Sequence, residues 1–126
     1  MLTKVETGNK LFPPTAQLKL TETEGNYIKG VLKKKVKDST YPNKTNYFIT
    51  VRDLEGTTVL WDKEAKTERH CDVSVDDDVF VKGFTTLERA LVDVVEGTYI
   101  EVTYTGKSTP AKGRKPAYLV DVSVDR

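Results

Sequence analysis

The last third of the chain carries two stretches in which apolar and polar residues alternate, residues 98–105 (TYIEVTYT) and 117–125 (AYLVDVSVD). Alternation with a period of two is typical of β-strands that have one buried face. The segment between them, residues 106–116 (GKSTPAKGRKP), contains glycine, proline and four Lys or Arg residues but no acidic residue. Because turn-forming residues separate two strand patterns, the sequence predicts a β-hairpin with a long basic loop.

Further strand patterns lie in the first half of the chain. Residues 17–37 form a first long strand region, in which Gly25 and Gly30 indicate a bulge or a sharp bend. Residues 46–53 (NYFITVRD) and 58–63 (TVLWDK) are predicted to pair as a hairpin around a glycine-containing turn. A long first strand that bends at a glycine is a common device in small barrels.

The segment that follows is polar and acidic. Residues 64–78 end in three consecutive aspartates and are predicted to form a loop, with one short strand at residues 72–75. Consecutive aspartates alternate in direction along an extended chain, whereas cation-binding loops space their ligands at alternate positions. A solvated acidic turn is therefore favoured over a metal site. A further short strand is predicted at residues 79–82.

One helix is predicted, over residues 86–94 (TLERALVDV), where apolar residues recur at helical spacing. Thr85, followed three residues later by Glu88, matches a capping box at the start of this helix. Gly97 is expected to end the helical region before the next strand.

The order of these elements is three strands, an insertion with a helix, and two strands. It matches the oligonucleotide/oligosaccharide-binding fold (OB-fold), in which a helix lies between the third and fourth strands. We predict an all-β protein with one short helix, built as a five-stranded OB-fold barrel; a meandering sandwich is the alternative. Residues 1–15 are predicted to be a flexible N-terminal arm and residues 16–126 a single OB-fold domain.

Composition limits the chemistry. The 126 residues suffice to bury a core, and no apolar run reaches the roughly 18 residues of a membrane span. The single cysteine, Cys71, excludes an internal disulfide and favours the reducing cytoplasm, that of the host cell for a viral protein. Adjacent His70 and Cys71 cannot complete a zinc site, and the motifs of phosphate-binding loops and catalytic triads are missing. We expect no enzymatic activity, no cofactor and no membrane association.

Charge is segregated along the chain, although the net charge is +1. Residues 1–52 contain ten Lys or Arg and four Asp or Glu, residues 53–101 contain five and thirteen, and residues 102–126 contain five and two. If the two ends of the chain are neighbours in a barrel, one face is strongly basic and the remainder is acidic. Such polarity directs a polyanion to one face.

Roughly residues 79–125 resemble the C-terminal half of small bacteriophage-type OB-fold single-stranded DNA-binding proteins. Those chains have a short helix, a glycine before a strand, a YxGK…KGR loop and a closing strand. The matching elements are the Thr85–Leu91 helix, Gly97, Tyr104, Gly106, Lys107, Lys112, Gly113 and Arg114. The chain departs from the pattern in ending with SVDR instead of an acidic tail, and in its longer, more acidic segment 64–78. The resemblance implies a role in DNA replication or recombination.

Single-strand binding without sequence preference requires a cationic groove for phosphates and aromatic faces for unpaired bases. On the second strand, Tyr47, Ile49 and Val51 form the face predicted to be buried, which places Phe48 and Arg52 on the groove face.

The other aromatic residues divide between core and ligand. Tyr104 and Tyr118 share faces with apolar residues and are predicted to pack in the core. Tyr27 and Tyr41 flank a lysine-rich segment and are favoured as ligand contacts. A lone tryptophan is more often buried, but Trp61 would also suit stacking if it lies near Phe48 across a hairpin.

Residues 29–37 contain five lysines and no acidic residue, which fits either phosphate contacts or a solubilising edge strand. The predicted nucleic-acid-binding residues are Tyr27, Lys29, Lys33, Lys35, Tyr41, Phe48, Arg52, Trp61, Lys107, Lys112, Arg114 and Lys115.

We therefore expect a protein that binds single-stranded DNA largely independently of sequence, with RNA as a second ligand. Expected partners are replication or recombination proteins and, along exposed strand edges, a second copy of the chain. The alternative is a protein-interaction module, such as a phage assembly component or an inhibitor of a host enzyme, that uses the acidic region 53–101.

Overall fold

Two strands of eleven residues each, β2 (Tyr27–Lys37) and β3 (Thr45–Glu55), form the centre of one large sheet. The structure, a computed structural model, describes residues 15–38, 40–41, 43–109, 112–113 and 115–125. The remaining elements are β1 (Ala16–Leu18), the 3-10 helix η1 (Leu20–Glu22), β4 (Thr58–Asp62), β5 (Thr67–His70), β6 (Asp78–Lys82), the helix α2 (Thr85–Leu91), β7 (Tyr99–Lys107) and β8 (Tyr118–Val124). The order across the sheet is β5-β4-β1-β6-β3-β2-β7-β8, antiparallel except for the parallel pair of β1 and β6.

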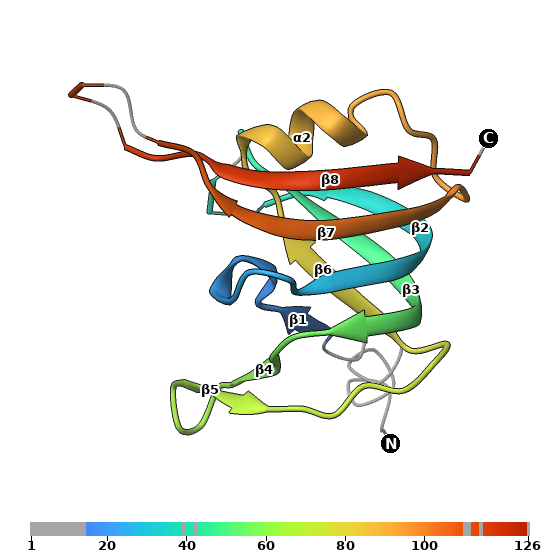
Figure 1. The fold of residues 1–126 in the computed structure, drawn as a ribbon. Coiled ribbons are helices and arrows are strands. Elements are labelled where there is room, and N and C mark those ends of the chain that lie inside the picture. Colours follow the sequence, from blue (N-terminus) through green and yellow to red (C-terminus); the bar gives the residue numbers. More distant parts are fainter. Residues whose placement is uncertain (1–14, 39, 42, 110–111, 114, 126) are drawn as a thin grey trace, which may run out of the picture.

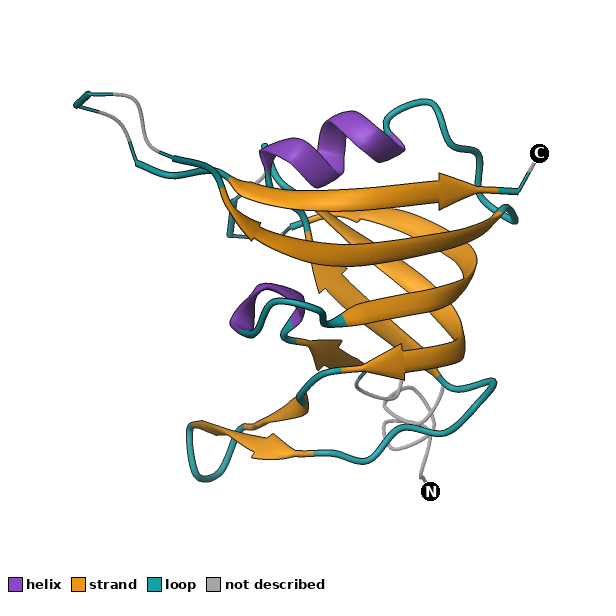
Figure 2. Ribbon diagram, in the orientation of Figure 1, coloured by secondary structure: helices purple, strands orange, loops and turns teal. Residues whose placement is uncertain are grey.

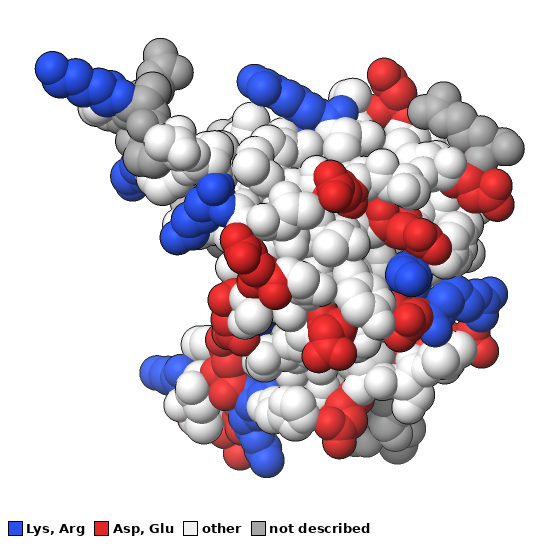
Figure 3. All heavy atoms as spheres, in the orientation of Figure 1, with Lys and Arg blue, Asp and Glu red and all other residues white. Residues whose placement is uncertain are grey.

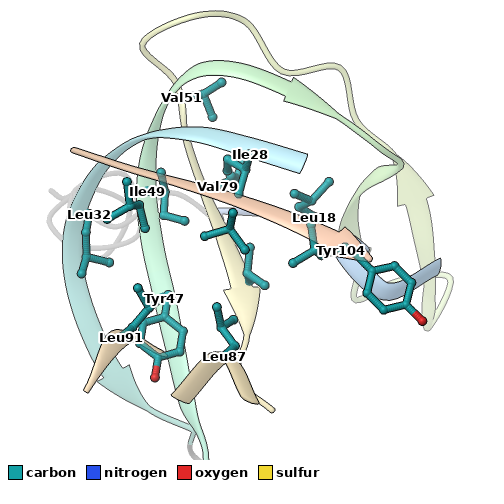
Figure 4. Close-up of a cluster of buried hydrophobic side chains, with 14 of the residues drawn as sticks. Leu18, Ile28, Leu32, Tyr47, Ile49, Val51, Val79, Leu87, Leu91 and Tyr104 are labelled. Carbon is teal, nitrogen blue, oxygen red and sulfur yellow. The ribbon is translucent and has the colours of Figure 1, made fainter. Parts of the chain in front are cut away.

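The sheet is strongly curved, and α2 lies beside it next to β8 (Figure 1, Figure 2). Alternate residues of the central strands point inward, where Ile28, Ile49 and Val79 meet in the core (Figure 4). Leu87 and Leu91 of α2 are fully buried in the same cluster. Each such side chain contributes about 1.5–3 kcal/mol through the apolar surface that it removes from water. The alternation seen in the sequence therefore decides which face of each strand is outside.

The prediction of an all-β protein with one short helix is confirmed, but the number of strands is larger than predicted. Eight strands occur in the described residues instead of five. A closed five-stranded barrel would need β6 to pair with β8. In the described residues β1 occupies that edge of β6 instead, and the sheet stays open. The predicted N-terminal arm falls almost entirely on residues 1–14, which lie outside the described residues.

The predicted first long strand is divided by a turn. Residues 17–37 contribute the end of β1, then η1, and then β2. Gly25 has φ +92°, a conformation that favours glycine, and the buried amide of Asn26 donates to the carbonyl oxygen of Leu20 at 3.3 Å. A buried side-chain hydrogen bond therefore stabilises the turn between η1 and β2. The bulge predicted at Gly30 is present, between Lys29 and Gly30.

The predicted hairpin of residues 46–53 with 58–63 is wrong. β3 already pairs with β2 on one edge and with β6 on the other, and a strand has only two edges. β4 pairs instead with β1 and β5.

The predicted loop 64–78 contains β5, whereas residues 72–75 are not a strand. All four side chains of β5 are exposed, so backbone pairing with β4 forms this strand without any burial pattern in the sequence.

The helix is present but shorter than predicted, and its predicted capping box is wrong. Phe84 is the N-cap residue of α2, no side chain caps the helix, and the last helical residue is Leu91. Glu88 Oε2 accepts a hydrogen bond from the backbone nitrogen of Thr45 at 2.9 Å. This carboxylate therefore fixes α2 to the start of β3 instead of capping its own helix.

Replacing Gly30 with alanine is expected to destabilise the protein by about 3 kcal/mol, the upper range for overpacking. A Cβ atom at this position would lie 2.1 Å from the backbone oxygen of Thr50 on the paired strand. The measurement is the free energy of unfolding in urea. Val36→Ala, an exposed change in the same strand, is the control and should stay within about 0.5 kcal/mol of the wild type. Equal values for the two variants would contradict the close approach of β2 and β3.

Candidate nucleic-acid interface

Two phenylalanines stack on the outer face of β3 and β6. Phe48 and Phe80 are register partners, with ring centroids 5.5 Å apart and ring planes at 30°. Both alternate with buried residues, so both rings project outward and remain partly exposed. Nζ of Lys34, on the neighbouring β2, lies 4.9 Å from the centroid of the Phe48 ring. With Lys82, the outward lysine at the end of β6, these residues form what we call the aromatic face.

A β-bulge brings Lys34 to Phe48. Leu32 pairs with Ile49, but the next pair is Lys34 with Phe48, so Lys33 is the extra residue. A bulge leaves one residue unpaired and re-aims the side chains beside it. Both lysines are exposed as a result, and only Lys34 lies over the Phe48 ring.

The connection between β2 and β3 is held by Asp38. Its Oδ1 accepts hydrogen bonds from the backbone nitrogens of Thr40 at 2.8 Å and Tyr41 at 3.0 Å, and its Oδ2 accepts one from Asn46 at 3.3 Å. These bonds, that of Tyr41 first, and the positive charge of Lys82 lower the pKa of Asp38. Asn46 is the register partner of Lys82, so this connection lies next to the aromatic face. The Tyr41 side chain is 64% exposed.

Acidification is expected to weaken this connection. Because the pKa of Asp38 is lowered by folding, its stabilising effect is present above the unfolded carboxyl pKa of about 3.9 and is lost as the pH falls through the folded value. The melting temperature of Asp38→Asn should therefore lie below that of the wild type at pH 7, and the difference should shrink below about pH 4. Asp93→Asn, at an exposed position after α2, is the control. A difference that stays constant down to pH 3 would contradict this role of the Asp38 charge.

A cleft of about 420 Å³ opens where the sheet does not close, and we call it the end cleft. Residues 17–22, 81–84 and Tyr118 line it. The ring of Tyr118 meets the rings of Phe84 and Tyr104 edge to face, at centroid distances of 5.6 and 6.0 Å. Lys19, Glu22 and Lys82 also line it, and the charge of Lys19 is paired with Glu68. The end cleft therefore continues the aromatic character of the aromatic face around the end of β6.

The basic loop between β7 and β8 projects from the body of the protein and carries Lys side chains (Figure 1, Figure 3). Lys107, Lys112 and Lys115 are exposed. Nζ of Lys107 lies 5.6 Å from the centroid of the Tyr118 ring, so the base of the loop borders the end cleft. Arg114 lies outside the described residues.

Three of the predicted cationic contacts already have partners within the fold. Lys33 forms an ion pair with Asp78 at 2.6 Å, and Arg52 forms one with Asp76. Nζ of Lys35 donates to the carbonyl oxygen of Leu91 at 2.7 Å, where a positive charge complements the C-terminus of α2. Lys35 in particular serves the fold.

Tyr27 and Lys29 lie among acidic residues on the outer side of β2 and β7, which we call the acidic face. The Tyr27 hydroxyl donates to Asp53 at 3.1 Å, and the Tyr99 hydroxyl donates to Glu101 at 2.9 Å. These hydrogen bonds raise the pKa of both tyrosines. Lys29 lies in register between Asp53 and Glu101. Acidic side chains are spread over this side of the molecule (Figure 3), which disfavours a polyanion there.

Trp61 is 59% exposed on β4 and is not part of the core. β6 and β1 lie between β3 and β4 in the sheet, so Trp61 does not face Phe48 across a hairpin as predicted.

The prediction that Tyr104 packs in the core is confirmed, with 4% exposure. Tyr118 is 38% exposed and lines the end cleft, so it is only partly a core residue.

Phe80 and Lys82 were not among the predicted contacts, and Lys34 was considered only as one of the five lysines of residues 29–37. For Phe80 a signal existed, because it alternates with Val79 and Val81 as Phe48 does with its buried neighbours. The position of Lys34 depends on the bulge, which the pattern of residues does not reveal.

The three consecutive aspartates have separate hydrogen-bond partners, although Asp76 lies in a turn with φ +76° and not in the extended chain that the alternation argument assumed. The hydrogen-bond donors to their carboxylates are Arg52 for Asp76, the Ser74 backbone for Asp77, and Lys33 and Thr50 for Asp78. Among the described residues, no group of three or more His, Cys, Asp or Glu side chains is placed to hold a metal ion. Within the same part of the chain, no helix has the length and apolar character needed to cross a membrane.

Comparison of the chain with protein-family models, curated proteins and solved structures finds no match. No family is therefore assigned, and the resemblance of residues 79–125 to phage-type proteins stays a prediction. The side chains of the candidate interface are the basis for inferring a function.

Proposed function

We propose that the protein binds single-stranded DNA with little sequence preference. The observation that carries the proposal is the stacked pair of Phe48 and Phe80, on the outside of the sheet, with Lys34 over one ring. Aromatic faces bind unpaired bases of any sequence, and nearby cations hold the phosphates. A pair of rings on the surface of a sheet is otherwise an unfavourable exposure of apolar area.

We also propose that the fold is of the OB type. β2, β3, β6, β7 and β8 follow in chain order, and their order in the sheet is third, second, first, fourth, fifth. α2 lies between the third and the fourth of them, as in an OB-fold. In this assignment the connections 38–44 and 108–117 join the first to the second strand and the fourth to the fifth.

In this assignment the candidate interface lies on the face with which OB-folds bind their ligands. OB-folds bind oligonucleotides on the face of their second and third strands, between the loops named above. β3 and β6 hold those two places, and they carry Phe48 and Phe80. Tyr41 lies on one flanking connection, and Lys112 and Lys115 lie on the other. The strand order and the placement of the aromatic residues together support the same ligand.

Of the predicted contacts, those on the acidic face are left out of the proposed site. Tyr27 and Lys29 have carboxylates as their neighbours, and Lys29 is five residues away from Lys34 along β2, about 17 Å at the rise of a strand. Lys35 is left out because its ammonium group binds the end of α2. Phosphate contacts are assigned to Lys34, Lys82 and the lysines of the β7–β8 loop.

The proposed role is to protect or present exposed strands during replication or recombination, as in the bacteriophage-type proteins that the C-terminal region resembles. RNA is retained as a second ligand, because stacking platforms and cations serve either polymer.

A second candidate function, protein binding, is favoured by the acidic face. Asp53 and Glu101 lie there with Tyr27 and Tyr99, and tyrosines are common in protein interfaces. Such a surface suits a basic protein partner and does not compete with the aromatic face.

The experiment is fluorescence anisotropy with a labelled oligothymidine of about 30 nucleotides, several OB-fold footprints long, beside duplex DNA of the same length. We expect salt-sensitive binding to the single strand and much weaker binding to the duplex. A labelled RNA of the same length measures the preference for DNA. Equal affinity for single strand and duplex, or no binding at low salt, would overturn the proposal.

A further inference from the structure

Trp61 exposes a large apolar surface at a defined place in the fold. It is the only tryptophan of the chain, and 59% of it is exposed on β4. Tryptophan usually buries most of its surface, and it is a strong partner for aromatic stacking. A ring exposed to this extent is accessible for stacking on a ligand.

The pairing register places Trp61 on the same side of the sheet as the aromatic face. Phe80 on β6 pairs with Gln17 on β1, and Gln17 pairs with Val59 on β4. Residues that are paired directly project to the same side of a sheet, and Trp61 follows Val59 by two residues. Trp61 therefore projects to the same side of the sheet as Phe80, although Val59, which precedes it on that side of β4, is buried.

The distance between the two aromatic sites suits a nucleic acid strand. Two strand spacings of about 4.8 Å and two residues along β4 at about 3.3 Å each separate Phe80 from Trp61, which gives about 12 Å. At about 3.4 Å per nucleotide, this is the span of three to four stacked nucleotides, and fewer of an extended strand.

The hairpin of β4 and β5 holds Trp61 in place. Glu68, the register partner of Trp61, forms an ion pair with Lys19 at 2.7 Å, which fixes the hairpin to the end of β1. Arg69 forms a second ion pair with Asp62 at 3.2 Å. A ring on a hydrogen-bonded strand loses little conformational freedom on binding. The charges of Lys19 and Arg69 are paired, so the contact that we assign to this hairpin is the Trp61 ring.

We propose that Trp61 is a second base-stacking site, which extends the bound strand from the aromatic face across β1 to the β4–β5 hairpin. The proposal rests on the proposed function and adds a minimum length to it. A dinucleotide is too short to reach from the aromatic face to Trp61, whereas a strand of about twelve nucleotides covers both sites.

The test uses the intrinsic fluorescence of Trp61, which reports on this site alone because the chain has no other tryptophan. A thymidine dinucleotide and an oligothymidine of about 12 nucleotides are titrated into the full chain, and binding is followed in parallel by anisotropy. We expect the longer oligonucleotide to quench the fluorescence and the shorter one to bind with little quenching.

Variants complete the test. Trp61→Ala should weaken binding of the longer oligonucleotide about tenfold and leave the shorter one unchanged, whereas Trp61→Phe should stay within about threefold of the wild type. Val92→Ala, another exposed apolar residue, is the matched control and should change neither affinity.

Binding of the longer strand without quenching, and without an effect of Trp61→Ala, would overturn this inference and leave the proposed function intact. Protein partners of the hairpin would then be sought. If neither oligonucleotide binds, both this inference and the proposed function are overturned.

Discussion

Replacing Phe48 and Phe80 together with alanine is expected to weaken binding of oligothymidine about 50-fold. Stacking contributes about 1–3 kcal/mol per base, and the loss of the stacked pair should cost about 2.3 kcal/mol of binding free energy. The Lys34 ammonium group also loses the ring that it contacts. The measurement is the dissociation constant from anisotropy, with the melting temperature of each variant recorded to show that it is folded.

Two comparisons make this result specific. Phe48→Tyr with Phe80→Tyr keeps both rings and should retain affinity within about threefold. Tyr27→Ala removes an aromatic ring from the acidic face and should have no more than a twofold effect. If the double alanine variant binds as well as Tyr27→Ala does, the aromatic face is not the site of stacking.

Neutralising Lys112 and Lys115 with glutamine is expected to lower affinity about 25-fold at 0.1 M salt. Each phosphate contact with a single strand contributes about 0.7 to the slope of log affinity against log salt. Removal of two contacts should reduce that slope by about 1.4, and the affinities of the variant and the wild type should converge at high salt. The measurement is a series of anisotropy titrations between about 0.05 and 0.5 M salt.

The control variant also loses two positive charges, but at positions outside the β7–β8 loop. Lys29→Gln with Arg89→Gln neutralises one cation on the acidic face and one exposed on α2. Its slope should equal that of the wild type. If both double variants lose the same slope, the salt dependence reflects net charge and not contacts of the β7–β8 loop.

Alternation predicted the faces of individual strands well. On β3 the buried residues Tyr47, Ile49 and Val51 and the outward Phe48 are all placed as predicted. The last hairpin is also present, with β7 and β8 within two residues of the predicted bounds. These features succeed because one buried face imposes its own period on a strand.

Partner strands could not be predicted in the same way. Nothing in the residues of β4 distinguishes pairing with β3 from pairing with β1 and β5, since the outcome depends on which edges are already occupied. β5 has no buried side chain and therefore no pattern to detect. The predicted proximity of Trp61 and Phe48 failed for this reason.

The lysine-rich segment of residues 29–37 shows why lysines that are close together in the sequence need not form one positively charged surface patch. Lys29 lies among carboxylates, Lys33 pairs with Asp78, and Lys34 lies over Phe48. Lys35 binds the end of α2. The bulge after Leu32 and the contacts of neighbouring elements distribute four lysines to four environments, which spacing along one strand cannot specify.

The most direct test of the proposed interface is an NMR titration of the isotope-labelled chain with an oligothymidine of about eight nucleotides, within the footprint of one OB-fold. Backbone amide shifts are mapped onto the sheet. We predict that the large shifts occur in β3 and β6 around Phe48 and Phe80 and in the connections 38–44 and 108–117, while the amides of the acidic face around Tyr27 and Tyr99 stay unchanged. Large shifts confined to β2 and β7, or no shifts at saturating oligonucleotide, would contradict it.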